Sequence, residues 1–276
     1  MKPVKLTIEE MYAGSHKSYE AFLDILDQSL NPRSPDTLYD KFNDLDPTSD
    51  SIVLDTGCRH AVQACELHRR FGCRVEGIDF VESNIREAQQ NIKDKELTHA
   101  IEVIQGDIHD MPYPESRFDF IWCRDVLGHM QDLQQAFKSC ARVLKANGKM
   151  LIFEVFATDL LTEEEAKHLW TPAATMPENM SREFFERAFT EAGFSIIEAD
   201  VFSSEWREYG EETESKITSK QLLRIARLRR NRERYIAEFG EKDYACELAN
   251  CHYGVYQMLG KLSPVVYSLV NSGYQQ

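Results

Sequence analysis

From residue 50 to residue 204 the chain alternates two patterns of hydrophobic and polar positions. Short apolar, β-branched runs are followed by stretches in which apolar residues recur every three or four positions. This alternation is typical of a parallel sheet whose strands are connected by helices. The runs that predict strands are 51–54, 73–78, 100–104, 118–123, 149–156 and 194–202.

The helical stretches between these runs carry recognisable boundaries. The helix after residue 79 has one apolar face from Val81 to Ile92. The next long one carries an apolar stripe from Leu133 to Leu144 and is expected to end at Asn147 and Gly148. A Ser at 181 is expected to cap a further helix.

After residue 204 the alternation stops, and about sixty residues of helical periodicity precede a last β-branched run at 264–270. We therefore predict an α/β fold: a mostly parallel seven-stranded sheet with helices on both faces and a helical cap inserted before the last strand. The expected parts are a helical segment at 1–48, a core at 49–204, the cap at 205–262, and the final strand with a tail at 263–276.

Composition and charge narrow the possible functions. Hydrophobic residues make up 42% and charged residues 28% of the 276 residues, which is typical of a folded globular protein. The net charge of −14 would repel a phosphate backbone, so a nucleic-acid partner is not expected. Nothing in the sequence indicates an oligomeric state.

The seven cysteines are scattered and lack the paired spacing of a zinc site, so no metal is expected, and they suit a reducing compartment. The first residues turn acidic before an apolar stretch develops, and no stretch approaches the roughly twenty apolar residues of a membrane span. We expect a cytoplasmic protein without a membrane partner.

The most informative segment joins the first predicted strand to the following helix. It contains Asp55, Gly57 and Cys58 at the point where the strand ends. Backbone N–H groups at such a turn face a helix N-terminus and favour a carboxylate or phosphate, and a glycine permits close approach. The second strand ends at Asp79, where a carboxylate can accept hydrogen bonds from ribose hydroxyls. These features predict a nucleoside-containing ligand at this edge of the sheet.

With these residues the chain resembles the class I S-adenosylmethionine-dependent methyltransferases, in particular the small-molecule, ubiquinone-type branch. The resemblance covers roughly residues 50 to 204, and five ordered blocks carry it. They are VLDxGC at 53–58, GID at 77–79, GDI at 106–108, FDFIW at 118–122 continuing into DVLxHMxD at 125–132, and RVLKxxG at 142–148.

The resemblance implies a Rossmann-like core that binds S-adenosyl-L-methionine and an acceptor side formed by the cap. By this resemblance Gly57 and its neighbours hold the methionine portion, Asp79 the ribose, and Asp107 with Ile108 the adenine. The remaining cofactor-site candidates are Asp55, Cys58, Arg59, Phe80, Cys123 and Arg124.

One departure from the family pattern concerns the glycine loop. The family usually has glycine at the positions held here by Arg59 and Ala61. The Arg59 side chain would either obstruct the cofactor or pair with its methionine carboxylate, since a charge-assisted hydrogen bond offsets lost backbone freedom. The first outcome leads to an alternative function, a non-catalytic binding or regulatory protein that has lost the cofactor.

Methyl transfer from a sulfonium depends mainly on alignment, so a dedicated base is optional. If the acceptor must lose a proton, His129 is the best-placed candidate base; the alternative is a histidine that packs or hydrogen-bonds structurally. Asp125 and Glu154, at strand ends, rank lower. The suspected acceptor-pocket residues, which core packing also explains, are Tyr19 in the N-terminal segment, expected to act as a lid, and Trp206, Tyr209, His252, Tyr253 and Tyr256.

Two other readings are weaker. A nicotinamide dehydrogenase would carry three glycines after the first strand, whereas residues 57–61 offer one. A protein or lipid acceptor would call for an open face rather than a long helical cap. The sequence thus predicts a methyltransferase acting on a small molecule and does not specify whether carbon, nitrogen or oxygen is methylated.

Overall fold

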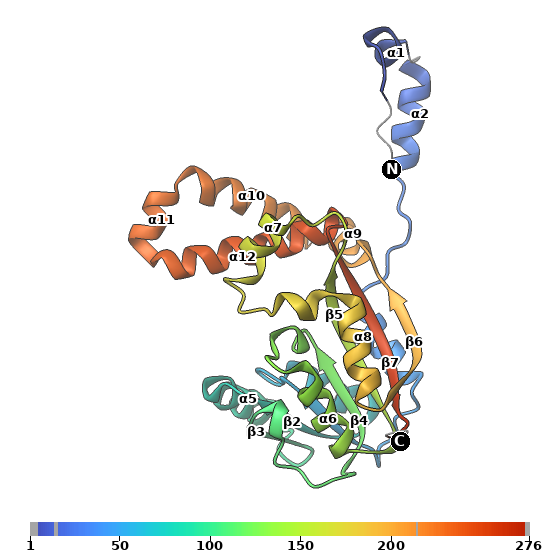
Figure 1. Ribbon diagram of the computed structural model, residues 1–276, viewed down its shortest axis with the longest axis vertical. Helices are drawn as coiled ribbons and strands as arrows, with labels where there is room; N and C mark the ends of the chain where they lie inside the picture. Colours follow the sequence, from blue (N-terminus) through green and yellow to red (C-terminus); the bar gives the residue numbers. More distant parts are fainter. Residues whose placement is uncertain (1–4, 14–15, 214, 274–276) are drawn as a thin grey trace. The chain divides into compact units, whose positions relative to one another are not determined.

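The computed structural model describes residues 5–13, 16–213 and 215–273, which form two compact units, Met1–Pro32 and Arg33–Gln276. The smaller unit contains α1 (Ile8–Tyr12) and α2 (His16–Leu26). Several large apolar side chains of this unit, among them Tyr19, Phe22 and Leu26, are exposed. The larger unit holds the sheet and all the helices that cover it (Figure 1).

A seven-stranded sheet in the order β3-β2-β1-β4-β5-β7-β6 forms the centre of the larger unit. Six strands run in the same direction, and β7 runs antiparallel between β5 and β6. The predicted mixed sheet of seven strands is therefore confirmed. The strands are β1 (Ile52–Thr56), β2 (Arg74–Asp79), β3 (Ile101–Gln105), β4 (Phe118–Arg124), β5 (Leu144–Ala157), β6 (Phe194–Val201) and β7 (Leu262–Asn271).

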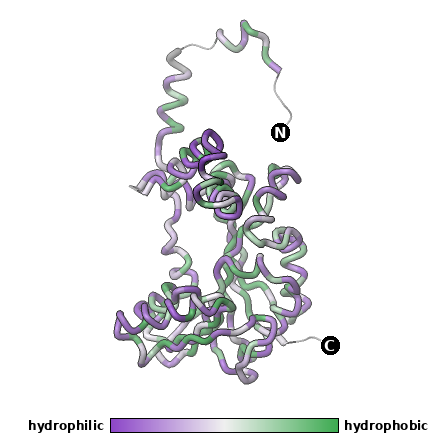
Figure 2. Tube along the Cα trace, turned by 90° about the vertical axis from the view of Figure 1, so that its left-hand side faces the viewer, coloured by the Kyte–Doolittle hydropathy of each residue, from purple (hydrophilic) through white to green (hydrophobic). Residues whose placement is uncertain are grey.

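Helices cover both faces of this sheet. On one face α3 (Thr37–Asn43), α4 (Val62–Phe71) and α5 (Glu82–Asp94) pack their apolar stripes against Val53, Val75 and Trp122. On the other, α6 (Leu133–Val143) and α8 (Arg182–Glu191) pack against Leu54 and Ile121. The central strands β1 and β4 are buried on both sides, because alternate side chains enter the two cores. In Figure 2 hydrophobic positions run along the strands, whereas hydrophobic and polar positions alternate along the surrounding helices.

The end of α6 differs from the sequence prediction. The helix stops at Val143, and Leu144 already pairs with Phe118 at the start of β5, whereas Asn147 and Gly148 were expected to end the helix. Pairing resumes only between Lys149 and Phe120, so the residues between bulge out of the ladder. Asn147, with φ 61°, supplies the turn inside this bulge.

The helical cap lies between β6 and β7, as predicted. It consists of α9 (Glu205–Glu212), α10 (Ile217–Arg230), α11 (Arg232–Phe239) and α12 (Glu241–Met258). Helix α7 (Glu163–Trp170), which follows β5, packs against α12. Figure 1 shows α7 and the helices α10 to α12 gathered beyond the carboxyl end of β5. This places the inserted residues at the edge of the sheet where the loops after β1 and β4 emerge.

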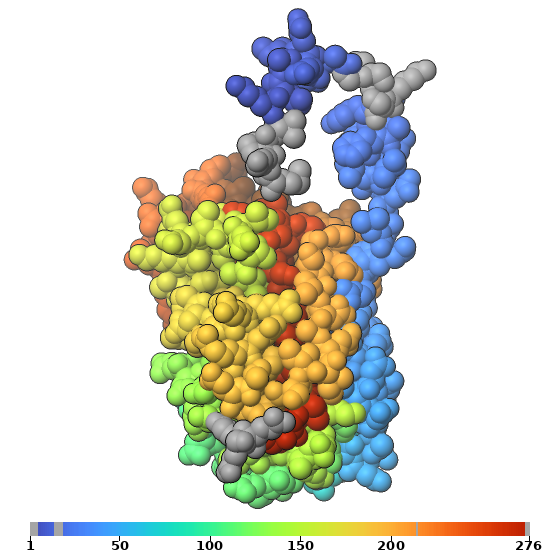
Figure 3. All heavy atoms as spheres, turned by 45° about the vertical axis from the view of Figure 1, so that its right-hand side comes forward, coloured from blue at the N-terminus to red at the C-terminus, as the bar shows by residue number. Residues whose placement is uncertain are grey.

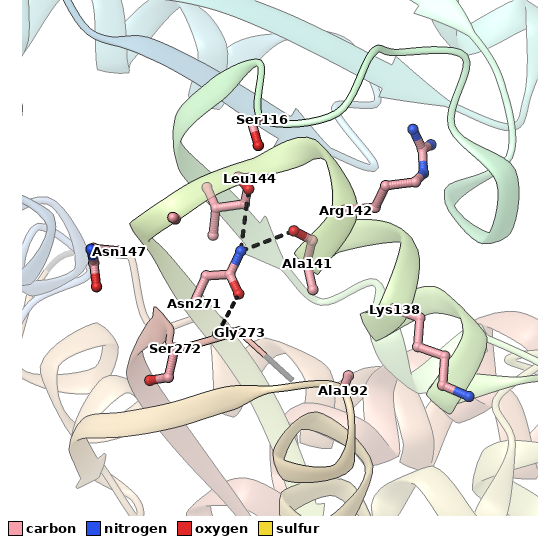
Figure 4. A pocket seen from close by; sticks show the side chains of 11 residues that line it. Ser116, Lys138, Ala141, Arg142, Leu144, Asn147, Ala192, Asn271, Ser272 and Gly273 are labelled. Carbon is pink, nitrogen blue, oxygen red and sulfur yellow. Dashed lines mark hydrogen bonds between the residues drawn. The ribbon is translucent and has the colours of Figure 1, made fainter. Parts of the chain in front are cut away.

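The opposite end of the sheet is closed by Asn271 at the end of β7. Its side-chain amide donates to the carbonyl oxygens of Ala141 and Leu144 at 2.9 and 3.2 Å, and thereby caps the end of α6 (Figure 4). The shallow pocket around this amide lies far along the strands from the loops after β1 and β4. Strand β6 forms a lateral edge of the sheet and exposes Ile196, Ile197 and Val201. The orange segment in Figure 3 shows this part of the chain at the surface.

No helix in the part of the chain that the structure describes is long and apolar enough to cross a bilayer.

Candidate active site

A cavity of about 660 Å³ opens at the carboxyl ends of β1, β2 and β4. Six of the predicted cofactor residues line it: Gly57, Arg59, Asp79, Phe80, Asp107 and Ile108. They come from the three turns after β1, β2 and β3, which the sequence separates by up to about fifty residues. We refer to this space as the first cavity.

The loop after β1 keeps a left-handed backbone at three alternate positions. The φ angles are 67° at Gly57, 46° at Arg59 and 57° at Ala61. A glycine is required at the first, because a Cβ at Gly57 would lie 2.3 Å from Cγ2 of Val126. Arg59 and Ala61 adopt the conformation at a cost of about 1–2 kcal/mol each, which surrounding contacts must offset. Arg59 lines the first cavity but does not fill it.

Asp79 joins this loop to the end of β2. Its Oδ2 accepts the backbone N–H of Arg59 at 2.9 Å, and its Oδ1 accepts the N–H of Val81 at 2.9 Å and the amide of Asn84 at 3.0 Å. A carboxylate offers about four acceptor positions, so three protein donors leave one for a ligand hydroxyl. The side chain therefore holds the loop in shape and still presents a negative acceptor to the cavity.

The next wall is formed by the turn after β3. Asp107 accepts the backbone N–H of His109 at 2.9 Å and its ring Nδ1–H at 2.7 Å, in the short helix η1 (Ile108–Asp110). Partial burial opposes ionisation, but these hydrogen bonds outweigh it and lower the pKa of Asp107. Ile108 is buried and Phe80 is 72% exposed, so the cavity combines a carboxylate with an apolar side chain and an exposed ring.

Four other predicted cofactor residues lie behind these walls. Cys58 and Cys123 are buried in the two cores, and burial raises the pKa of both thiols. Asp55 is buried next to the loop, and burial raises its pKa to about 8. Among the described residues its Oδ2 has no hydrogen-bond partner. Arg124 lies over the rings of Phe153 and Trp206, at about 5.7 and 5.6 Å from their centroids.

A second cavity of about 420 Å³ adjoins the first. Arg59, Asp125 and His129 line both spaces. Its other walls come from β5, α7, the α7–α8 connection and the cap helix α12. They include Glu154, Leu169, Trp170, Met180, Asn250 and Tyr253. An acceptor in this second cavity would therefore lie directly beside a ligand in the first.

Two carboxyl groups line the second cavity, and one of them, Asp125, also lines the first. Glu154 is buried, and its oxygens accept the N–H groups of Gly128 and Val155 at 3.0 and 3.1 Å. Burial raises its pKa to about 8, and the nearby Asp125 carboxylate adds to the effect. Asp125 is 43% accessible because it faces the cavities, yet the surrounding protein raises its pKa despite Arg124 at 3.5 Å.

His129 ends the short helix η2 (Leu127–His129) that follows β4. Its Nδ1 lies 3.1 Å from the carbonyl oxygen of Ala174. A carbonyl only accepts, so Nδ1 carries the proton of the neutral ring and Nε2 keeps the free lone pair. This geometry suits the predicted role of His129 as a base.

The connection between α7 and α8 holds η2 by hydrogen bonds, which we call the clamp on η2. The buried side-chain amide of Asn179, in η3 (Pro177–Met180), donates to the carbonyl oxygens of Leu127 and Met130 at 3.1 and 2.7 Å. The N–H of Met176 donates to Gly128 at 2.9 Å. Asn179 is not among the site residues predicted from the sequence, because a polar residue in a connecting segment carries no periodic signal of what it contacts.

The suspected acceptor residues are distributed differently from the cofactor residues. Trp206 stacks on Phe153 at 4.2 Å, and with Tyr209 it lies on α9, outside the lining described for both cavities. His252 and Tyr256 face a third, separate cavity between α7 and α12. Tyr253, their neighbour, lines the second cavity instead. Tyr19 is exposed on α2 in the smaller unit.

Among the residues that the structure describes, no cluster of three or more His, Cys, Asp or Glu side chains is placed to hold a metal ion.

Comparison with known proteins agrees with this geometry. A family model described as a methyltransferase domain matches residues 54–152. A sarcosine/dimethylglycine N-methyltransferase from Halorhodospira halochloris is 32% identical over 111 residues, or 40% of this chain and 39% of that protein. A sterol 24-C-methyltransferase from Pneumocystis carinii is 26% identical over 64% of this chain and 50% of its own length. The matches thus span half or less of these relatives.

Solved structures share the fold at low sequence identity. The geranyl diphosphate C-methyltransferase from Streptomyces coelicolor, solved with S-adenosyl-L-homocysteine, has a TM-score of 0.63 at 14% identity over 85% of this chain and 78% of that one. The [4+2]-cyclase SpnF has a TM-score of 0.66 at 19% identity, with 89% and 85% covered. Residues 54–152 therefore match the methyltransferase-domain family, and the chain has the fold of the class I S-adenosylmethionine-dependent methyltransferases.

Proposed function

We propose that this protein transfers a methyl group from S-adenosyl-L-methionine to a small molecule enclosed in the second cavity. The single observation that carries the proposal is the shared wall of Arg59, Asp125 and His129 between the two cavities. Direct displacement at a methyl group requires donor and nucleophile side by side in a space that excludes water. Two adjoining cavities at the carboxyl end of the sheet provide that arrangement.

The residues of the first cavity fit this cofactor. The close approach at Gly57, where a Cβ would strike Val126, leaves a cradle for the methionine portion. Asp79 retains an acceptor position for a ribose hydroxyl, and Ile108 with Phe80 offers apolar contact to a flat base. Arg59 supplies a cation beside the cradle for the methionine carboxylate. When bound, the cofactor supplies an electrophilic methyl group on a positively charged sulfur.

The protein's own task in the reaction is to orient the acceptor and manage its proton. His129 is the proposed catalytic residue, since its Nε2 is free and its Nδ1 is fixed by Ala174. Glu154 shapes the segment around it by accepting the Gly128 N–H. Tyr253 on α12 closes the second cavity, which gives the cap its proposed role on the acceptor side.

Calorimetric titration with S-adenosyl-L-methionine and, separately, S-adenosyl-L-homocysteine tests the proposal. We expect micromolar binding that weakens about tenfold or more in Asp79→Ala, because a charge-assisted hydrogen bond contributes about 1.5–3 kcal/mol. Glu102→Ala is the matched control, since it removes an exposed carboxylate from the adjacent strand β3. Absence of binding to the wild-type protein would favour the non-catalytic alternative.

We further propose that the protein acts in the cytoplasm on a small molecule rather than on nucleic acid. All seven cysteines are free thiols, six of them buried, which suits a reducing compartment. The net charge of −14 opposes binding to a polyanion.

A further inference from the structure

The second cavity combines features that select for the charge of its occupant. We infer that the methyl acceptor is a small primary or secondary amine, which Asp125 and Glu154 attract as its ammonium form and which is methylated on nitrogen. This inference rests on the proposed function, because it concerns the acceptor of that same site.

The charge of the second cavity is the first argument. Two carboxylates, Asp125 from the end of β4 and Glu154 from β5, line it. Among the described residues of its lining, Arg59 is the one permanent cation, and it also faces the cradle for the cofactor carboxylate. Glu154 is largely protonated near neutral pH, so the lining is close to neutral before a ligand enters. An ammonium beside Glu154 favours its ionised form, and the two carboxylates then outnumber Arg59, whereas an anion gains no such partner.

Groups from several elements influence the ionisation of the Asp125 carboxyl group. Its Oδ1 lies 3.5 Å from the Tyr253 hydroxyl, and its Oδ2 lies 3.5 Å from Nε of Arg124. Both contacts are long, so the carboxylate is incompletely satisfied by the protein. The charged or titratable groups that influence it electrostatically are Arg124 on β4, Glu154 on β5, Arg207 on α9, His129 on η2 and Tyr253 on α12. An ammonium group would supply the short hydrogen bonds that these neighbours do not.

The aromatic walls are the second argument. Trp170 and Tyr253 line the second cavity with ring centroids 6.5 Å apart and planes inclined at 73°. Ring faces attract cations, and a desolvated site strengthens this attraction. Leu169 and Met180 provide apolar contact for the carbon skeleton of the same molecule.

The third argument is the route for the proton. An ammonium has no lone pair and must lose one proton before it can attack the methyl group. The free Nε2 of His129 accepts that proton, and Asp125 stabilises the imidazolium. The nitrogen lone pair then forms the new N–C bond as the C–S bond breaks, and that electron pair stays on sulfur. The product is a methylated ammonium, and the His129 proton passes to solvent.

An anionic acceptor fits less well. A phosphate or diphosphate would face two carboxylates and would need several cations or a metal. The described residues contain no metal-ligand cluster, as stated above. Among the residues that the structure describes, no basic residue of α10 or α11 lines the second cavity.

The test compares matched amines and alcohols on the full-length protein. The probes are benzylamine and ethylamine, with benzyl alcohol and ethanol as their neutral counterparts. Calorimetry measures their binding to the protein saturated with S-adenosyl-L-homocysteine. Mass spectrometry then follows transfer of a deuterated methyl group to a wider library of primary and secondary amines, alcohols, phenols and carbon acids.

We expect amines to bind at least tenfold more tightly than their counterparts and to be the compounds that are methylated. Asp125→Asn should weaken amine binding about tenfold, while Asp159→Asn, at an exposed loop position, should change neither amine nor cofactor affinity. If the cofactor binds but amines show no preference, or if a hydroxyl or carbon is methylated, the inference is wrong and the proposed function stands. If no cofactor binds, both fail.

Discussion

The backbone N–H of Arg59 donates a 2.9 Å hydrogen bond to Oδ2 of Asp79, so the carboxylate expected to bind ribose also fixes the loop expected to bind methionine. The bond uses the main chain and leaves the Arg59 guanidinium free to face the cavities. The two motifs that the sequence separates by twenty residues are therefore one physical unit.

The first prediction concerns the side chain of Arg59. Arg59→Gly removes the cation and relieves a left-handed conformation, which offsets the 0.5–1 kcal/mol entropic cost of glycine. We expect the unfolding free energy to change by less than about 1 kcal/mol and cofactor affinity to fall about tenfold. Calorimetry with thermal unfolding measures both, and Arg59→Lys should be intermediate. Unchanged or tighter binding in Arg59→Gly would mean that the guanidinium obstructs the site.

The second prediction concerns buried carboxylates and pH. The folded-state pKa of Asp55 is raised to about 8, above its ordinary value near 3.8. The folded protein therefore holds a proton that the unfolded chain releases, and this contribution to stability is lost as pH rises from about 4 to 8. Asp55→Asn mimics the protonated form, so its stability relative to wild type should improve between pH 5 and pH 8.5.

Urea unfolding at several pH values measures this difference. Asp94→Asn, at an exposed helix end, is the control and should show a constant offset from wild type. A difference between Asp55→Asn and wild type that does not depend on pH would contradict the raised pKa of Asp55. Glu154→Gln should behave as Asp55→Asn does, since the pKa of Glu154 is also raised to about 8.

The third prediction concerns the clamp on η2. Asn179→Ala leaves the carbonyl oxygens of Leu127 and Met130 without their buried donor, at about 1–3 kcal/mol per unsatisfied group. We expect a loss of about 2–4 kcal/mol in unfolding free energy. Because η2 carries His129, the turnover rate should fall at least tenfold, while affinity for S-adenosyl-L-homocysteine should change little.

Gln134→Ala removes an exposed hydrogen bond to Glu191 and serves as the control for the loss of a side-chain amide. An unchanged turnover rate in Asn179→Ala would mean that the clamp does not determine the position of His129. A pH–rate profile that shifts in Asn179→Ala would indicate that the clamp acts through the histidine.

The fourth prediction concerns the N-terminal segment. The exposed Tyr19 and Phe22 on α2 suit the lid role expected for residues 1–48. If the segment acts so, the Tyr19→Ala, Phe22→Ala double variant should raise the KM for the acceptor about threefold to tenfold. Stability of the larger unit should not change. Glu20→Ala on the same helix is the control, and an unchanged KM for the double variant would remove the lid role.

The sequence predicted the fold and the first cavity well because both depend on local signals. Strand runs, helical stripes and the residues at strand ends, such as Asp79 and Asp107, follow from periodicity and from the edge at which parallel strands end. A carboxylate that directly follows a strand lies at that edge however the rest of the chain folds.

The second cavity was harder to predict because its walls come from distant connections. Trp170, Asn179 and Tyr253 come together only when α7, η3 and α12 have packed. Tyr253 and His252 are adjacent on α12, yet they point in different directions, so Tyr253 lines the second cavity and His252 lines the third. The end of α6 was misplaced for a similar reason, since pairing between Leu144 and Phe118 overrides the turn signal of Asn147 and Gly148.

The wall formed by Arg59, Asp125 and His129 has a consequence for how the two ligands influence each other. Each side chain faces both spaces, so any shift that one ligand imposes on the wall alters the free energy with which the other binds. Such coupling is reciprocal: the factor by which cofactor changes acceptor affinity equals the factor by which acceptor changes cofactor affinity. Titrations of either ligand, with and without the other, should close this thermodynamic cycle, and substitutions in the wall should change its coupling energy.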